Sequence, residues 1–233
     1  KAKAVPLGHL GQMARGSELF TGAALDGVPQ EVSDDEVAAV PDPASLTILP
    51  WQKEVAWFAS DLHLRGEPFE ACSRNVLHRM RAEAAAMGYR FNLGIETEFF
   101  VLKRNGAGDL VPYSGRDSLD KPAYDVRGLL DNLPWLDELV QAMNGLGWGV
   151  YSFDHEDGPG QFETDFDYAE VLTMADRLTF FKLMAKEIAH RHGLIATFMP
   201  KPFGDRTGSG AHYNMSLADL ASGENLFVDP AGK

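Results

Sequence analysis

Apolar residues recur at helical spacing in the second half of the chain. The longest stripe predicts a helix over residues 168–192 and consists of Leu172, Ala175, Leu178, Phe181, Ala185 and Ile188. A second helix is predicted over residues 75–87, where Gly88 is placed to end it. Pro134 favours the first turn of a helix and predicts a third one over residues 134–145.

Strand patterns surround these helices. The first 70 residues are broken by Gly and Pro and offer strand candidates at 45–49 and 55–62. Further strands are predicted at 91–103, 148–155, 194–199 and 211–217, and one begins at Gln161. This mixed order favours an α+β fold, an antiparallel sheet with helices on one side, over a doubly wound parallel sheet. We predict a small β-rich domain over residues 1–70 and a second domain over residues 71–233.

Composition limits the class of protein and its partners. With 45% hydrophobic and 24% charged residues the chain is globular, which excludes disorder and collagen. A net charge of −13 argues against binding to nucleic acid or to an anionic membrane. No run approaches the ~18–20 apolar residues that span a bilayer. Cys72 is the single cysteine, which predicts an intracellular, cytoplasmic protein.

Some features have simple structural interpretations. The acidic tract over residues 30–43 lacks the regular ligand spacing of a calcium loop, which favours a solvated loop. His190 and His192 end the longest helix, where the helix dipole accounts for them. The opening Lys-Ala-Lys-Ala-Val-Pro is typical of the middle of a longer polypeptide.

The strand at 91–103 carries two neighbouring carboxylates. Its period of two places Glu96 and Glu98 on one face, with Ile95, Thr97 and Phe99 on the other. Adjacent buried carboxylates repel each other, so a divalent cation would account for them. An edge strand with one solvated face accounts for them equally well.

A second acidic constellation lies at a predicted turn. Residues 157–160 have turn chemistry, which would bring Glu156 and Glu163 onto neighbouring strands. Hard oxygen ligands of this kind suit Mg²⁺ or Mn²⁺, and Mg²⁺ usually serves to hold phosphate. An ordinary hairpin with polar edges remains open as the alternative.

The third constellation follows a Gly-rich loop over residues 207–210. If a strand begins at Ala211, then His212, Asn214 and Ser216 share a face that can hold a metal and a phosphate. The Gly-Ser-Gly tripeptide alone is a weak signal, and a lone histidine is more often structural.

In chain order these motifs resemble the glutamine synthetase family. They read Gly-Ile-Glu-Thr-Glu-Phe-Phe from Gly94, His-Glu-Asp-Gly-Pro-Gly-Gln-Phe-Glu from His155, and Ala-Thr-Phe-Met-Pro-Lys-Pro-Phe from Ala196 before Gly-Ser-Gly-Ala-His. The resemblance covers essentially the whole chain and is weakest before residue 40. It implies an N-terminal β-grasp-like domain, followed by the first part of the catalytic domain. The segment around Trp51 is most similar to the branch that includes glutamylmethylamide synthetase.

The resemblance also implies roles for single residues. Glu98, Glu156 and Glu163 match the carboxylates of a first metal site, and Glu96 and His212 match ligands of a second one. Glu156 would also face the incoming amine as the catalytic carboxylate. Gly208 matches a position that holds substrate glutamate, and Tyr124 falls near the ammonium-site tyrosine. The expected ATP-binding residues are Ser216, Tyr168 and Asn214.

Two positions depart from the family pattern. Asn214 stands where a second histidine usually contacts the γ-phosphate, and asparagine carries no positive charge. Thr21 aligns with an aspartate that binds ammonium, and Ala24 aligns with a serine. These changes indicate either an amine other than ammonia or a chain whose function has drifted.

The resemblance implies an ATP-dependent ligase that joins the γ-carboxylate of glutamate to ammonia or an amine through a γ-glutamyl phosphate, with Mg²⁺ or Mn²⁺. A γ-glutamyl-alkylamine or polyamine ligase is one alternative. A non-catalytic scaffold or regulatory relative is another. The family also implies a ring-shaped homo-oligomer, commonly a dodecamer.

Overall fold

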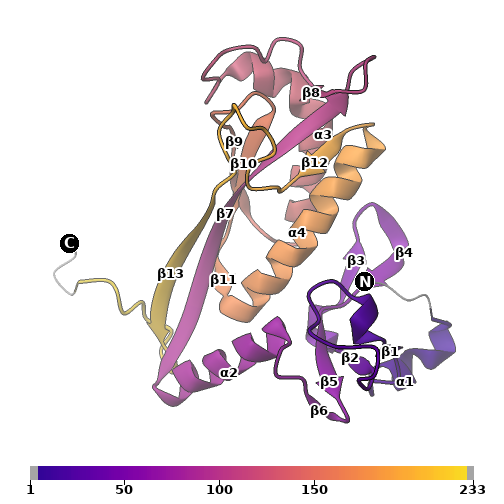
Figure 1. Ribbon diagram of the computed structural model, residues 1–233. Coiled ribbons are helices and arrows are strands. Elements are labelled where there is room, and N and C mark those ends of the chain that lie inside the picture. The colour runs from indigo at the N-terminus through magenta and orange to yellow at the C-terminus, as the bar shows by residue number, and fades with distance from the viewer. Residues whose placement is uncertain (1–4, 230–233) are drawn as a thin grey trace. The chain divides into compact units, whose positions relative to one another are not determined.

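A computed structural model describes residues 5–229 (Figure 1). Residues 1–4 and 230–233, which belong to the predicted first and second domains, lie outside the described part. The chain divides into two compact units: one runs to Arg90 and includes Asp219–Glu224, and the other begins at Phe91, runs to Ala218 and resumes at Asn225. The predicted domain boundary near residue 70 stays a prediction.

The first unit is rich in short strands, as predicted. Its four-stranded sheet has the order β1-β2-β5-β6, formed by Leu19–Phe20, Val37–Pro41, Ser60–Leu64 and Glu67–Pro68. A separate pair consists of β3 (Thr47–Leu49) and β4 (Gln52–Trp57). The single strand expected over 55–62 is therefore wrong. The strand is interrupted at Ala59, whose N–H donates to Ser45 Oγ at 2.8 Å. The residues before it pair with β3 and those after it pair with β2, in different sheets.

Short helices complete the first unit's N-terminal part. They are the 3₁₀ helices Leu7–His9, Gly22–Ala24 and Pro43–Ser45 and the short α1 (Leu10–Met13). The longer α2 (Ser73–Ala86) matches the helix predicted over 75–87, and Gly88 follows it with φ +84°. That left-handed conformation favours glycine and ends the helix.

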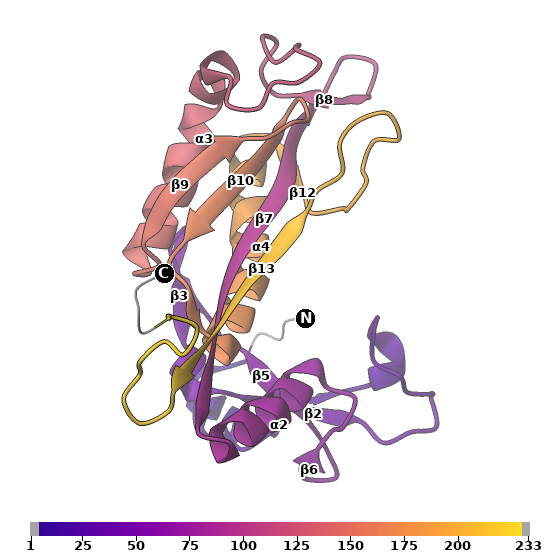
Figure 2. The ribbon, with the colours of Figure 1, turned by 90° about the vertical axis from the view of Figure 1, so that its left-hand side faces the viewer.

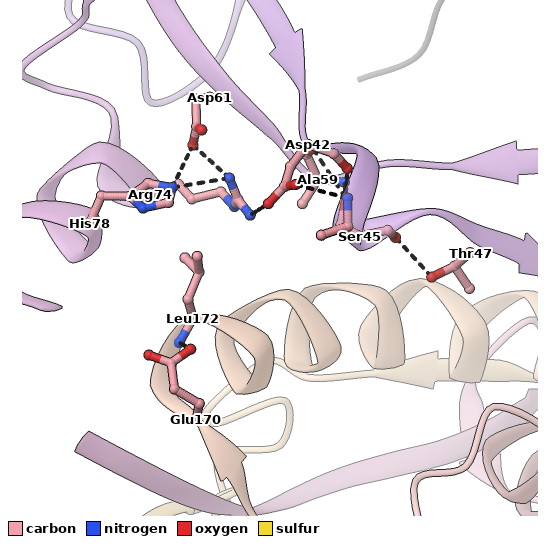
Figure 3. A network of polar contacts seen from close by, with 10 residues as sticks. Asp42, Ser45, Thr47, Ala59, Asp61, Arg74, His78, Glu170 and Leu172 are labelled. Carbon is pink, nitrogen blue, oxygen red and sulfur yellow. Dashed lines mark hydrogen bonds and ion pairs between the residues drawn. The ribbon is translucent and has the colours of Figure 1, made fainter. Parts of the chain in front are cut away.

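Arg74 on α2 joins two acidic residues of the first unit (Figure 3). Its guanidinium is 10% exposed and lies 2.7 Å from both Asp42 Oδ2 and Asp61 Oδ1. His78 Nε2 lies 3.4 Å from the same Asp61 oxygen. Burial alone would raise the pKa of Asp42, but the hydrogen bonds from Arg74 and from Ala44 N–H outweigh it and lower that pKa. Arg74 therefore ties α2 to the strands beside it.

The second unit is built on the long strand β7 (Tyr89–Arg104), which begins two residues before the unit does. The central path of its seven-stranded sheet is β11-β7-β10-β9, and β8, β12 and β13 also pair with β7. These other strands are β8 (Leu110–Pro112), β9 (Val150–His155), β10 (Gln161–Phe166), β11 (Ala169–Glu170), β12 (Ile195–Thr197) and β13 (Ala211–Asp219). The pairings of β8, β10, β11 and β12 with β7 are antiparallel, which confirms the predicted sheet type.

Two long helices, α3 (Val126–Gly145) and α4 (Val171–Arg191), cover one face of this sheet (Figure 2). Phe99 of β7 is fully buried, and its ring meets Trp135 of α3 and Phe181 of α4 edge to face, at centroid distances of 6.3 and 5.8 Å. The hydrophobic core therefore lies between the helices and the odd-numbered side chains of β7. The expected arrangement, helices on one side of the sheet, is confirmed.

Two helix boundaries differ from the prediction. Pro134 does not start α3 but lies inside it, because the helix already begins at Val126. Buried residues on both sides of the proline hold the helix, among them Asn132 and Trp135, which are joined by a 2.7 Å hydrogen bond. The long helix begins at Val171 and not at 168, since Ala169 and Glu170 pair with β7 as β11. No helix within residues 5–229 has the length and apolar character needed to cross a bilayer.

Candidate metal and substrate site

The sheet face opposite the helices carries the predicted polar residues. Glu96 and Glu98 are half-buried on this face of β7, and their neighbours Ile95, Thr97 and Phe99 are buried on the other face. This alternation is the one predicted. The two glutamates therefore belong to a face that the hydrophobic core leaves open.

Strand register brings the two acidic motifs together. Glu163 of β10 is directly opposite Glu98 of β7 on one side and Asp154 of β9 on the other. Three carboxylates thus lie in one row across three strands. Like charges directly opposite each other destabilise a sheet, so the row needs a compensating cation or protons.

A second group of polar residues shares Glu163 with this row. One ligand atom each from Glu96, Glu163 and His212 lies within 4.8 Å of the others. His212 Nδ1 is 3.3 Å from Glu96 Oε2, and Asn214 Nδ2 donates to Glu96 Oε1 at 2.7 Å. The predicted placement of His212 and Asn214 on one face of a strand is confirmed, because both side chains of β13 reach the same glutamate.

Glu98 contacts the Gly-rich loop. Its Oε2 accepts hydrogen bonds from Gln161 Nε2 at 2.7 Å and from Gly210 N–H at 3.0 Å. A Cβ at residue 210 would stand 2.8 Å from Glu98 Oε1, so the Gly210 backbone lies close against this carboxylate. The same Gln161 amide donates to the Gly208 carbonyl at 3.0 Å. One buried side chain thus fixes both the carboxylate and the loop.

The predicted turn at residues 157–160 is present between β9 and β10. Glu156 N–H donates to the Gln161 carbonyl at 2.9 Å, which sets Glu156 beside the start of β10. Thr207 Oγ1 donates to Asp157 Oδ2 at 2.7 Å. The turn and the Gly-rich loop are therefore joined to each other.

Crowding of these carboxylates shifts their protonation. Burial, followed by the charges of Asp165, Glu156, Glu98 and Glu96, raises the pKa of Glu163 to about 8. The pKa of Glu156 is raised by burial and then by Glu98, and that of Asp165 by burial and then by Glu96. The face is thus short of positive charge.

The donor set fits a divalent cation. Carboxylate oxygens with one imidazole suit Mg²⁺ or Mn²⁺, and Gly210 leaves open the space beside Glu98 that a side chain would fill. The structure brings ligand atoms of Glu96, Glu163 and His212 within reach of one another and places Glu98 opposite Glu163. Glu156 is close enough for its charge to raise the pKa of Glu163. These residues could hold metal ions, and their roles as ligands stay a prediction.

The remaining predicted residues lie around this cluster. A Cβ on Gly94 would lie 3.6 Å from Tyr168 Cβ and 3.7 Å from Asn214 Cβ, so the exposed Tyr168 and Asn214 both border Gly94. Ser216 follows Asn214 by two positions on β13. Tyr124 is 78% exposed with φ +63°, and its N–H donates to the His155 carbonyl at 2.9 Å.

Sequence reasoning missed three polar residues of this face. Gln161 and Asp165 alternate with Glu163 along β10, and Asp154 of β9 is opposite Glu163. The period-two pattern from Gln161 onward would have placed Gln161 and Asp165 beside Glu163.

Comparison with known proteins agrees with this geometry. The family described as the catalytic domain of glutamine synthetase matches residues 70–233. The chain belongs to the glutamine synthetase family.

Its relatives include two differently named enzymes. A glutamine synthetase of Rhizobium leguminosarum bv. phaseoli is 41% identical over 231 residues, which are 98% of this chain and 52% of the relative. A glutamate–methylamine ligase of Methyloversatilis universalis is 39% identical over 234 residues, 100% of this chain and 52% of the relative. The chain thus spans about half the length of the curated relatives it matches.

A solved structure described as a GmaS/ADP complex superposes with a TM-score of 0.92 at 41% identity, covering 98% of this chain and 52% of that one. An apo GmaS structure gives the same TM-score at 40% identity, with 100% and 54% covered. The mixed fold with its antiparallel sheet is therefore that of a glutamine synthetase-type catalytic domain.

Proposed function

We propose that the full-length protein is an ATP-dependent ligase that joins the γ-carboxylate of glutamate to ammonia or a small amine. The observation that supports this most strongly is the convergence of Glu96, Glu163 and His212 on one sheet face, in a chain of the glutamine synthetase family. The predicted β-grasp topology of residues 1–70 is part of the same proposal.

The proposed reaction has two steps. An oxygen of the glutamate γ-carboxylate attacks the γ-phosphorus of ATP, the bond to the β-phosphate oxygen breaks, and ADP leaves. The amine nitrogen then attacks the acyl carbon, the carbon–oxygen bond to phosphate breaks, and the amine loses a proton. When bound, Mg²⁺ or Mn²⁺ would neutralise phosphoryl charge and orient donor and acceptor.

The residues of the chain would divide these tasks. Glu98, Glu156 and Glu163 would hold one metal, while Glu96 and His212 would contribute to a second. Glu156 would also face the amine, where a carboxylate favours its cationic form before deprotonation. We assign Gly208 and Tyr124 to the glutamate and amine sides of the site. We assign three residues to ATP: Ser216, Tyr168 and Asn214.

The choice of amine follows from Thr21. Its hydroxyl donates to Glu36 Oε1 at 2.9 Å, and it stands where the family resemblance places an ammonium-binding aspartate. Since a neutral hydroxyl binds ammonium less well than a carboxylate does, we propose an alkylamine such as methylamine as the preferred substrate. A relative named glutamate–methylamine ligase supports this choice.

Assembly and location are proposed on the same family basis. We propose a ring-shaped homo-oligomer, on the pattern of a dodecamer, in the cytoplasm, acting on small molecules and not on nucleic acid or membranes.

The direct test is ADP release by the full-length protein with glutamate, ATP, Mn²⁺ and a panel of ammonium, methylamine, longer alkylamines and polyamines. Amide product in proportion to ADP is expected, with methylamine used best. The rival proposal, a non-catalytic scaffold motivated by Asn214 and Thr21, predicts no product with any amine. It also predicts no thermal stabilisation by Mn²⁺ with ATP.

A further inference from the structure

A buried ion pair lies directly behind the turn that carries Glu156. The side chains of Asp117 and His155 are 0% and 1% exposed, and His155 Nε2 lies 2.8 Å from Asp117 Oδ2. Neither residue has a role in the function proposed above. A buried pair of charges is costly unless it is well hydrogen-bonded. The hydrogen bonds of this pair therefore show which backbone segments it holds in place.

Both ring nitrogens of His155 face acceptors. Nδ1 lies 2.8 Å from the Glu156 carbonyl oxygen, which can only accept, and Nε2 faces the Asp117 carboxylate. Both ring nitrogens are therefore engaged with fixed partners, one on each side of the ring.

The pair joins both ends of the turn to a third segment. Asp117 Oδ2 also accepts from Gly160 N–H at 2.5 Å, while His155 holds the Glu156 carbonyl. The His155 carbonyl in turn accepts from Tyr124 N–H at 2.9 Å. Tyr124 is held at φ +63°, a conformation that a residue with a side chain adopts only when its surroundings impose it.

The His155 ring is enclosed by close packing. A Cβ on Gly128 of α3 would stand 2.9 Å from His155 Cδ2, so the helix approaches the ring as closely as glycine allows. The Phe162 ring meets it from another side with centroids 4.9 Å apart. The ring is therefore held in one position, and the contacts of His155 in turn fix the backbone of Glu156 and Tyr124.

We propose that Asp117 and His155 are positioning residues that fix Glu156 and Tyr124 relative to each other, and so set the affinity of the site for its amine. This inference rests on the proposed function, which places both residues at the amine side. It extends that proposal from the residues that would touch the amine to the buried pair that orients them.

Three variants of the full-length protein separate the contacts. His155→Asn keeps an amide N–H near the position of Nδ1, whereas Asp117→Asn keeps the shape of the carboxyl group and removes its charge. Gly128→Ala leaves both residues in place and pushes the ring, while its helix gains intrinsic propensity. The matched controls are Glu138→Gln and His192→Asn, which break an ion pair of 2.7 Å that is about one-third exposed.

Each variant is assayed for the KM of methylamine, the KM of ATP and the melting temperature. We expect the KM of methylamine to rise about tenfold in all three, while the KM of ATP stays within twofold and the controls stay at the wild-type values. An unchanged KM of methylamine in Gly128→Ala would overturn the proposal. So would an equal rise of both KM values, because that is the pattern of a general disturbance of the site and not of an effect on its amine side.

If the wild-type protein makes no amide, hydrogen exchange still tests whether the pair holds these segments in place. Residues 156–161 and 117–124 should exchange faster in His155→Asn than in His192→Asn, while α4 is unchanged. In that case the proposed function fails and the holding role of the pair stands. Equal exchange in the two variants refutes the role, whatever the activity.

Discussion

Glu98 and Glu163 are directly opposite each other in the β7–β10 ladder, so two carboxylates meet where a sheet normally pairs neutral or opposite charges. The β-structure holds them there, because Phe99 and Phe162 next to them are fully buried on the other face. The repulsion is thus built into the fold. It is relieved by protons when no cation is present and by a cation when one is bound.

Removing one of these charges should stabilise the metal-free protein. With the pKa of Glu163 raised to about 8, the folded state binds more protons than the unfolded state between about pH 4.5 and 8. Stability without metal therefore falls as pH rises through this window. Glu163→Gln should abolish that part of the fall and raise the melting temperature at pH 8 by roughly 2–4 °C.

Calorimetry in the presence of a chelator measures this effect. Glu138→Gln is the control, since Glu138 of α3 pairs with Arg191 and His192 at the C-terminal end of α4. A melting temperature that is lower in Glu163→Gln than in the wild type at pH 8 would contradict the assignment of repulsion to this site.

Gln161 should affect the KM of glutamate, although its side chain is neutral. Its amide bonds both Glu98 and the Gly208 carbonyl, and Gln161→Ala would free both. Losing about 1–2 kcal/mol of hydrogen bonding raises the KM of glutamate roughly 5- to 30-fold. Steady-state kinetics checks this, with Gln141→Ala as control because Gln141 donates an exposed hydrogen bond to Asp137, one turn earlier on α3. Equal KM values in the two variants would refute it.

The preference of the enzyme between ammonium and methylamine should depend on Thr21. Thr21→Asp restores a carboxylate at the position of the family's ammonium ligand, and Glu36→Gln in the same chain removes the repulsion from its present partner. We expect the ratio of kcat/KM for ammonium to that for methylamine to rise about tenfold, as one charged hydrogen bond can supply. A ratio that does not change would show that Thr21 has no part in amine selection.

The Arg74 contacts should dominate the stability of the first unit's polar network. Arg74→Ala leaves Asp42 and Asp61 without their shared cation, which we expect to lower the free energy of unfolding by about 2 kcal/mol. Arg65→Ala removes an exposed pair with Asp35 and should cost less than about 0.5 kcal/mol. Urea unfolding of both variants distinguishes the two cases, and equal losses would contradict the network's role.

Local patterns predicted most of the site. Period-two alternation placed Glu96 and Glu98 on one face of β7, because the buried opposite face leaves that strand no other register. The same alternation put His212 and Asn214 on one face of β13, although β13 is exposed over residues 211–215. Turn residues likewise predicted the meeting of Glu156 with Glu163. Alternation could not reveal the Asp117 and His155 pair, since 38 residues separate its members and only the folded loop joins them. The prediction that Pro134 starts a helix was wrong for a related reason. The buried residues on both sides of Pro134 override its preference for the first turn of a helix.

The acidic sheet face that carries Glu98 and Glu163 should bind a divalent cation, and electron paramagnetic resonance of free Mn²⁺ measures this binding. Titration of the full-length protein with Mn²⁺, with and without ATP, should show bound metal in the wild type and a loss of at least one site in Glu98→Gln and Glu163→Gln. Wild-type levels of bound Mn²⁺ in both variants, or no binding by the wild type, would contradict a metal site on this face.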